Sequence, residues 1–265
     1  GGAAKGTKQK KKSCCGRLPT KAQQVVHSDA HKSQPCFPTF FAKAARRVDF
    51  APALWYNEGM KEFSDLLYTG ETGEKFAAFY DFLVRKNEQF NLTAVTGREE
   101  CYAKHFADSL AGMRFFPQGA ACCEVGSGAG FPSVPLMIAR PDLTFDLFES
   151  SEKKCAFLRE AAQMLGLRAR VHALRAEDAG KDPRFREQFD VCCARAVARM
   201  NTLAEYCVPL VRVGGLFIAY KGRAEEELAE AAHAYSVLGV RPAHTVCFTW
   251  EEVGTRTLAV LEKTA

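Results

Sequence analysis

The 265-residue sequence lacks the patterns of a metal ribbon, a secretory signal and a membrane anchor. Its 11 cysteines include no C-x-x-C pair, the spacing of zinc ribbons and thioredoxin-type motifs. No apolar run reaches the ~18 residues of a transmembrane helix, and the N-terminal residues lack the apolar stretch of a secretory signal. We therefore expect a reduced, cytoplasmic protein that holds no metal and lies in no membrane.

The excess of positive charge lies in the first part of the chain. Residues 1–59 hold 11 Lys and Arg against 3 Asp and Glu, whereas residues 60–265 hold 25 against 28. The formal charge of +5 therefore combines a segment of +8 with a mildly acidic remainder of −3. Because the first 50 residues also show little periodicity, residues 1–59 are predicted to be a basic, disordered leader. A nucleic-acid-binding arm and a targeting segment are the alternatives.

Two helical patterns precede the rest of the fold. The spacing of apolar residues predicts a helix over 73–90, with Thr72 as its N-cap and Asn91 as its stop, and a second helix from about 99 to 116. Residues 60–118 are therefore expected to form an N-terminal helical segment.

From residue 119 to 265, short apolar runs alternate with helical patterns. Strands are expected at 120–125, 143–148, 170–174, 189–194, 215–220, 242–249 and 257–261, with helices near 133–140, 157–165, 200–211 and 224–238. Such alternation predicts an α/β fold whose mostly parallel, seven-stranded sheet carries helices on both faces. The last two strands have no long helix between them and are expected to pair antiparallel at one edge.

The sharpest local signal is a glycine turn after the first expected strand. Gly126, Gly128 and Gly130 are spaced G-x-G-x-G, with Glu124 two residues earlier and Glu149 at the end of the second strand. Glycines let a ligand approach the backbone, and an acid at the second strand suits a ribose diol. Dinucleotide-binding turns are spaced G-x-G-x-x-G instead. The pattern is typical of Rossmann-like class I methyltransferases, which bind S-adenosylmethionine.

Further motifs follow one another in the order of a known family. They are Asn87–Ala94 (NEQFNLTA), His105–Leu110 (HFADSL), Gly126–Pro132 (GSGAGFP), Glu149–Lys154 (ESSEKK), Arg175–Glu177 (RAE), Ala194–Ala196 (ARA) and Tyr220–Gly222 (YKG). Over roughly 60–265 the sequence resembles the RsmG, or GidB, family of 16S ribosomal RNA guanine-N7 methyltransferases. The resemblance implies S-adenosylmethionine as cofactor and 16S ribosomal RNA or the small ribosomal subunit as partner. We expect a monomer.

The resemblance also implies site residues at the ends of the strands. The cofactor-binding set is Gly126, Gly128, Gly130, Phe131, Glu149, Ala176, Glu177 and Arg195. In this set Glu149 would bind the ribose, and Ala176 with Glu177 would flank the adenine. Two residues depart from the family pattern, namely Ser133 where Gly is usual and Glu124 where Asp is commoner.

Arg195 and Lys221 are the candidate catalytic residues, because they follow the fourth and fifth strands. For Arg195 the alternative is an ion pair with a nearby acid, and for Lys221 it is a helix cap or a solvated side chain rather than an RNA contact. His105 and Asp108, three apart on one helical face, are expected to pack or cap rather than to catalyse.

The chemistry of guanine N7 agrees with this site. N7 carries a lone pair and no proton, so that catalysis needs orientation rather than a general base. The sequence also lacks the N-P-P-[YF] motif of amine methyltransferases. The alternatives are a methyltransferase for another RNA or a small molecule, a nicotinamide-dependent oxidoreductase, and a non-catalytic RNA-binding module. Lys and Arg are expected at the cofactor edge, with acids such as 225–227 on the far side.

Overall fold

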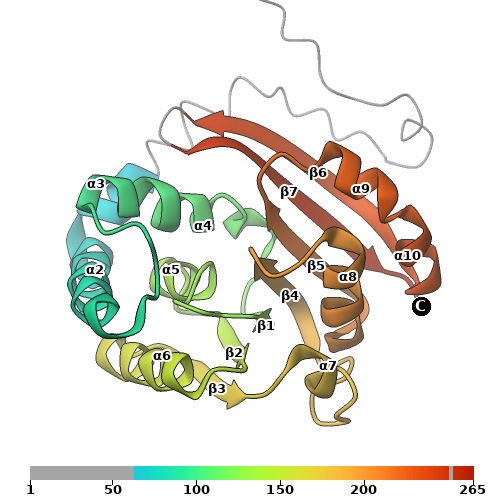
Figure 1. The fold of residues 1–265 in the computed structure, drawn as a ribbon, viewed down its shortest axis with the longest axis horizontal. Coiled ribbons are helices and arrows are strands. Elements are labelled where there is room, and N and C mark those ends of the chain that lie inside the picture. Colours follow the sequence, from blue (N-terminus) through green and yellow to red (C-terminus); the bar gives the residue numbers. More distant parts are fainter. Residues whose placement is uncertain (1–62, 251–252) are drawn as a thin grey trace, which may run out of the picture. The chain divides into compact units, whose positions relative to one another are not determined.

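The computed structural model describes residues 63–250 and 253–265 (Figure 1). The predicted leader at 1–59 lies outside the described residues. Within the described ranges no helix is long and apolar enough to cross a membrane.

A seven-stranded sheet forms the centre of the fold. Its strands are β1 (Ala121–Val125), β2 (Thr144–Glu149), β3 (Ala169–Ala173), β4 (Phe189–Arg195), β5 (Val211–Lys221), β6 (Val240–Trp250) and β7 (Gly254–Lys263). They lie in the order β3-β2-β1-β4-β5-β7-β6. Strands β1 to β5 are parallel, and β7 is antiparallel to both β5 and β6. The predicted mostly parallel sheet with an antiparallel edge pair is confirmed.

The strand order reverses beside β1. The chain moves outward from β1 to β3 and then returns to place β4 on the other side of β1, where Glu124 pairs with Cys193. In open α/β sheets, ligands bind at the carboxyl ends of the strands at this switch point. The glycine turn follows β1 at that place, so the topology puts it where a ligand is expected.

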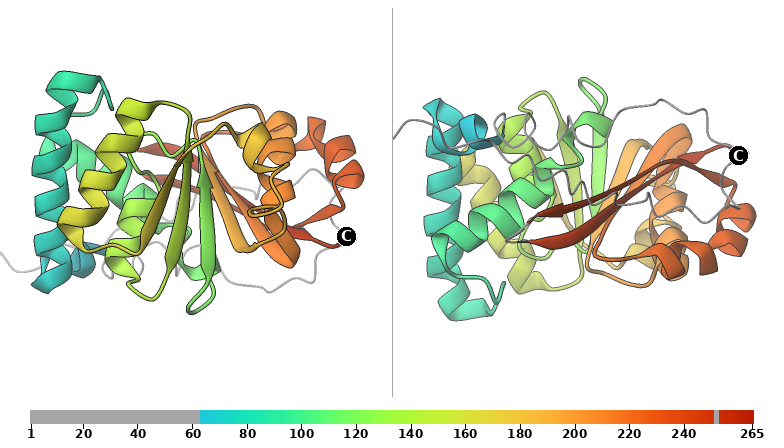
Figure 2. Two further views of the ribbon diagram at one scale, coloured as in Figure 1. Left: turned by 90° about the horizontal axis from the view of Figure 1, so that it is seen from below. Right: turned by 90° about the horizontal axis from the view of Figure 1, so that it is seen from above.

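Helices cover both faces of the sheet, as Figure 2 shows. One layer holds α2 (Gly70–Phe90), α3 (Arg98–Cys101), a π-helix (Tyr102–Ala107), α4 (Asp108–Leu110), a 3₁₀ turn (Met113–Phe115), α5 (Ser133–Ala139) and α6 (Glu152–Leu165). The other holds α7 (Ala176–Ala179), α8 (Met200–Cys207), a 3₁₀ turn (Val208–Leu210), α9 (Glu225–Glu230) and α10 (Ala232–Val237).

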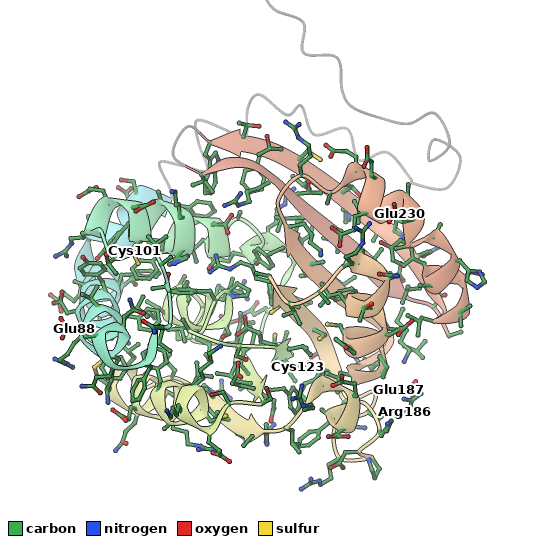
Figure 3. The ribbon with its side chains drawn as sticks, viewed as in Figure 1. Glu88, Cys101, Cys123, Arg186, Glu187 and Glu230 are labelled. Atoms are coloured by element: carbon green, nitrogen blue, oxygen red, sulfur yellow. The ribbon has the colours of Figure 1, made fainter. Side chains whose placement is uncertain are left out.

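Neighbouring cysteines of the central strands face opposite layers. Cys122 and Cys193 belong to the core under α5 and α6, whereas Cys123 and Cys192 belong to the core under α8. All four are fully buried and free. Figure 3 shows Cys123 in the interior, and Glu88 at the outer surface of α2. The cysteines therefore act as small apolar side chains, as the sequence predicts.

The N-terminal helices and the sheet bury one continuous core. Phe76 and Phe79 of α2 and Phe106 of the π-helix are fully buried. The Phe79 ring centroid lies 5.7 Å from that of Phe106 and 5.8 Å from that of Phe131, which follows the glycine turn. The helical segment thereby forms one wall of the region around the turn.

The sequence misplaces several helix boundaries. Helix α2 begins at Gly70 with Thr69 as its N-cap, not Thr72, and it ends as predicted at Asn91, whose φ is 49°. The expected helix at 99–116 is divided, because the backbone widens into a π-helix that buries Tyr102 and Phe106 together. The expected helix at 224–238 consists of the short α9 and α10.

Replacement of Phe79 by Ala tests the shared core. Loss of this buried ring is expected to lower the free energy of unfolding by about 3–5 kcal/mol and to keep a single transition in urea. Met164→Ala, at a side chain that is 45% exposed on α6, is the control, with an expected change within about 0.5 kcal/mol. Two separate transitions in the wild-type protein would contradict one core.

Candidate active site

The turn after β1 requires glycine. Gly126, Gly128 and Gly130 have φ values of 68°, 54° and 85°, in the region that side chains disfavour. A Cβ at Gly126 would lie 2.6 Å from Val197 Cγ2, and one at Gly130 would lie 2.6 Å from Val134 Cγ2. The turn is therefore a tight cradle, with the side chains of Val197 and Val134 in the places that a Cβ at Gly126 or Gly130 would take.

Glu149 links the glycine turn to the end of β2. Its Oε2 accepts a hydrogen bond from the Gly128 N–H at 2.9 Å, and its Oε1 accepts one from the Ser151 N–H at 2.8 Å. The side chain is largely buried. The acid that the sequence assigns to a ribose is thus held by backbone donors beside the cradle.

Ser133 and Glu124, the two residues that the sequence analysis singles out beside the turn, touch each other. The Ser133 hydroxyl of α5 donates a hydrogen bond to Oε2 of Glu124. The other oxygen, Oε1, is buried and has no hydrogen-bond partner among the described residues. Burial raises the pKa of Glu124 to about 8. At neutral pH this acid is therefore mostly protonated beneath the turn.

Arg195, at the end of β4, is held on several sides. Its Nη1 donates to Oδ2 of Asp108 at 3.0 Å and to the Lys104 carbonyl at 3.3 Å. Its Nη2 lies 3.2 Å from Nδ1 of His105, and its guanidinium carbon lies 4.9 Å from the centroid of the Phe131 ring. The ion pair considered as the alternative for Arg195 is present, and it lies beside the cradle.

Asp108 joins two arginines from distant strands. Its Oδ2 pairs with Arg195, and its Oδ1 accepts from Nε of Arg256 on β7 at 3.0 Å. The carboxylate is nearly fully buried. One negative charge at the start of α4 therefore fixes the ends of β4 and β7 against the helical segment.

His105 lies in the π-helix next to this pair. Its ring stacks on Phe131 with centroids 4.4 Å apart, and its Nε2 lies 2.8 Å from the Thr93 hydroxyl. Burial, and secondly the charge of Arg195, lower the pKa of His105 to about 4. The imidazole is therefore neutral at physiological pH.

Lys221, at the end of β5, is also engaged. Its Nζ donates to Oε1 of Glu227 and to the Ala198 carbonyl, both at 2.6 Å, and its side chain is 11% exposed. It thereby fixes the β4–α8 loop, in which Ala196 has a φ of 56° and Val197 overlies Gly126.

The sequence predicts that the acids at 225–227 lie on the side away from the cofactor edge. This prediction is wrong for Glu227, because its carboxylate pairs with Lys221 at the carboxyl end of β5. Helix α9 begins four residues after that strand. Its first turn therefore stays near the carboxyl end of β5 and does not reach the side away from the cofactor edge.

A family model described as rRNA small subunit methyltransferase G matches residues 72–257. The chain belongs to the GidB family. It is 47% identical over 194 residues to ribosomal RNA small subunit methyltransferase G of an Exiguobacterium species, with 71% of this chain and 82% of that protein covered. The same enzyme of Pelotomaculum thermopropionicum is 46% identical over 188 residues, with 69% and 78% covered.

A solved structure also matches. It is geranyl diphosphate C-methyltransferase from Streptomyces coelicolor A3(2), in complex with Mg²⁺, geranyl diphosphate and S-adenosyl-L-homocysteine. The identity is 12%, the TM-score is 0.49, and the match covers 60% of this chain and 79% of that one.

The GidB motifs that contain Thr93, His105, Phe131 and Arg195 meet around Arg195, whereas Glu149 contacts the glycine turn at Gly128. Ala176 and Glu177 open α7 at the end of β3, where the charge of Glu177 raises the pKa of Tyr206. Lys221 ends β5 and binds the carbonyl of Ala198 in the β4–α8 loop. The roles assigned to these residues stay predictions. The described part of the chain contains no group of three or more His, Cys, Asp or Glu side chains that could hold a metal ion.

Sequence reasoning missed two residues of the site. Arg256 lies 148 positions from its partner Asp108, and no motif marks it. Val197 packs against Gly126, but in the sequence it is a single apolar residue in an expected loop, which predicts no role. Only the adjacent ARA motif indicated that this loop belongs to the site.

The protonation of Glu124 predicts a pH dependence of stability. Between the unfolded value of 4.5 and the folded pKa of about 8, the folded protein keeps a proton that the unfolded chain has released. The free energy of unfolding therefore falls as pH rises, by roughly 1.4 kcal/mol per pH unit. Glu124→Gln, which imitates the protonated acid, should remove this slope in urea denaturation between pH 5 and 8.

The difference in slope between wild type and Glu124→Gln isolates the effect of Glu124, because both proteins keep His105. The lowered pKa of His105 makes the free energy of unfolding rise with pH between about pH 4 and 6.5, in both proteins alike. Glu152→Gln, at an exposed position of α6, is the control and should leave the wild-type slope intact. Parallel pH curves for wild type and Glu124→Gln would show that the buried acid is ionised.

Proposed function

We propose that this chain transfers a methyl group from S-adenosylmethionine to N7 of a guanine in small-subunit ribosomal RNA. The observation that carries the proposal is the glycine cradle of a GidB-family chain, with Glu149 on one side and Arg195, stacked on Phe131, on the other. Glu149 and Arg195 lie at the carboxyl ends of β2 and β4, the strands on either side of β1, where open α/β sheets bind their ligands.

The residues present fit S-adenosylmethionine. The three glycines add no side chains of their own to the cradle, and the space beside Gly128 holds only the Gly126 carbonyl oxygen, 3.7 Å from where a Cβ would lie. A carboxylate is already oriented at Glu149 to accept from ribose hydroxyl groups. Bound here, the cofactor would supply an electrophilic methyl group on a sulfonium centre. Phe131 would offer an aromatic face, and Ala176 with Glu177 would flank the adenine.

Among the residues that the structure describes, no free general base lies beside Arg195. Asp108 is bound to two arginines, His105 is a neutral imidazole of low basicity, and Glu124 keeps its proton at neutral pH. A hydroxyl or amine acceptor would need a base before or during attack, whereas guanine N7 presents a lone pair. The arrangement therefore favours N7, with orientation as the main source of rate.

The target guanine must leave any base stack to reach the cradle. We infer that it lies in 16S ribosomal RNA, presented free or in the small ribosomal subunit. Arg195 would contact the cofactor or the base, and Lys221 would act through the loop that it holds. A monomeric state and a cytoplasmic location stay predictions.

Methyl transfer by the purified chain tests the function. Labelled S-adenosylmethionine is offered with 16S ribosomal RNA and with small subunits from cells that lack the guanine-N7 methyl group. We expect label at one guanine, mapped by reduction and aniline cleavage, which breaks RNA at N7-methylguanine. Label at an exocyclic amine, a ribose or a pyrimidine would overturn the N7 assignment. Label only in another RNA would favour the alternative substrate.

Glu149→Gln tests the cofactor site separately. Because charged hydrogen bonds contribute about 1.5–3 kcal/mol each, the affinity for S-adenosylmethionine in titration calorimetry should fall roughly 10- to 100-fold. Glu152→Gln, three residues further along on the exposed start of α6, should bind as the wild type does. Equal affinity of wild type and Glu149→Gln, with melting temperatures unchanged, would remove Glu149 from the site.

A further inference from the structure

Four residues, Asn87, Thr93, His105 and Arg195, are connected by polar contacts in a series that begins at the end of α2. The Asn87 amide binds the backbone of Thr93 twice, since its Nδ2 donates to the Thr93 carbonyl at 2.9 Å and its Oδ1 accepts from the Thr93 N–H at 2.8 Å. The Val95 N–H donates to the Thr93 hydroxyl at 3.0 Å. Thr93 is thus fixed in position and orientation.

The series continues to the end of β4. The Thr93 hydroxyl lies 2.8 Å from Nε2 of His105, and Nδ1 of the same ring lies 3.2 Å from Nη2 of Arg195. Three motifs that are separate in the sequence, containing Asn87, His105 and Arg195, are therefore connected from one polar group to the next.

The proton on His105 decides whether the series is complete. Its Nδ1 lies near a donor, Nη2 of Arg195 at 3.2 Å, and near an acceptor, the Lys104 carbonyl at 3.1 Å. A guanidinium can only donate, so the first contact is a hydrogen bond only if Nδ1 carries no proton. The Lys104 carbonyl already accepts from Nη1 of Arg195, and in this tautomer Nε2 donates to Thr93.

We propose that Asn87, Thr93 and His105 are positioning residues for Arg195, with His105 as the neutral Nε2–H tautomer that accepts a hydrogen bond from the guanidinium. The inference rests on the proposed function, in which Arg195 contacts the cofactor or the guanine. None of the three needs to touch substrate.

Two features of the surroundings support this role. Arginine has a flexible side chain whose ordering costs entropy, and the series restrains Nη2 while Asp108 and Phe131 restrain the rest of the group. His105 also resists protonation, because burial and the charge of Arg195 lower its pKa to about 4. An imidazolium would have only donors toward the guanidinium and would repel it.

The tautomer is measured first, on the full-length wild-type protein. Long-range ¹H–¹⁵N correlation spectra at pH 7 distinguish the two neutral imidazoles and the imidazolium, with His105→Asn used to assign the signals. We expect the Nε2–H form, and a shift of the Nδ1 resonance in Arg195→Ala. The Nδ1–H form or an imidazolium would overturn the proposal. This readout does not depend on catalysis.

A double-mutant cycle then tests the action through Arg195. Thr93→Val, which removes the hydroxyl, should lower kcat about 5- to 10-fold with the KM for S-adenosylmethionine changed less than twofold. Thr93→Ser, which keeps the hydroxyl, should retain wild-type kcat. In an Arg195→Ala background, Thr93→Val should cause no further loss. Equal losses in both backgrounds, or full kcat for Thr93→Val, would contradict positioning.

Failure of this inference and failure of the proposed function look different. If the chain methylates no guanine N7, the function is wrong, whereas the tautomer and the Nδ1 response to Arg195→Ala still decide the hydrogen bond. If methylation proceeds but Arg195→Ala keeps full kcat, there is nothing for the series to position and the inference is overturned.

Discussion

The ion pair between Arg195 and Asp108 is the interaction on which the rest of the site depends. Removing two charges from water is costly, and a buried pair is retained only when further hydrogen bonds satisfy its remaining atoms. Here Asp108 also binds Arg256, and Arg195 also meets a carbonyl, an imidazole and an aromatic face. The pair therefore joins the helical segment, β4 and β7 at one point beside the glycine cradle.

This arrangement explains how a site in which the described residues offer no free base suits its chemistry. The acids nearest to Arg195 are occupied or protonated, and the histidine is neutral. What the protein supplies is a shaped and oriented surface, held by a shared core and by Lys221 on the loop over Gly126. Ser133 and Glu124 form one buried pair beneath the cradle.

Local patterns were enough to predict much of this fold. Apolar runs marked the strands, and the spacing of Gly126, Gly128 and Gly130 with the acid at Glu149 marked the cradle, because each depends on residues close together in the sequence. Contacts between distant segments could not be found in this way. Arg256 is brought to Asp108 by the antiparallel pairing of β7 with β5, and no local pattern marks the π-helix at Tyr102–Ala107. The engagement of Lys221 with Glu227 likewise depends on how closely α9 follows β5.

The most direct measurement of this account is the single-turnover rate of guanine-N7 methylation by Asp108→Asn at saturating S-adenosylmethionine and RNA. Asparagine keeps the shape of the side chain and removes the charge that both arginines share. We expect the rate to fall at least about 10-fold, since hydrogen bonds to charged groups contribute about 1.5–3 kcal/mol. A wild-type rate in a folded Asp108→Asn protein would show that the ion pair does not organise the site.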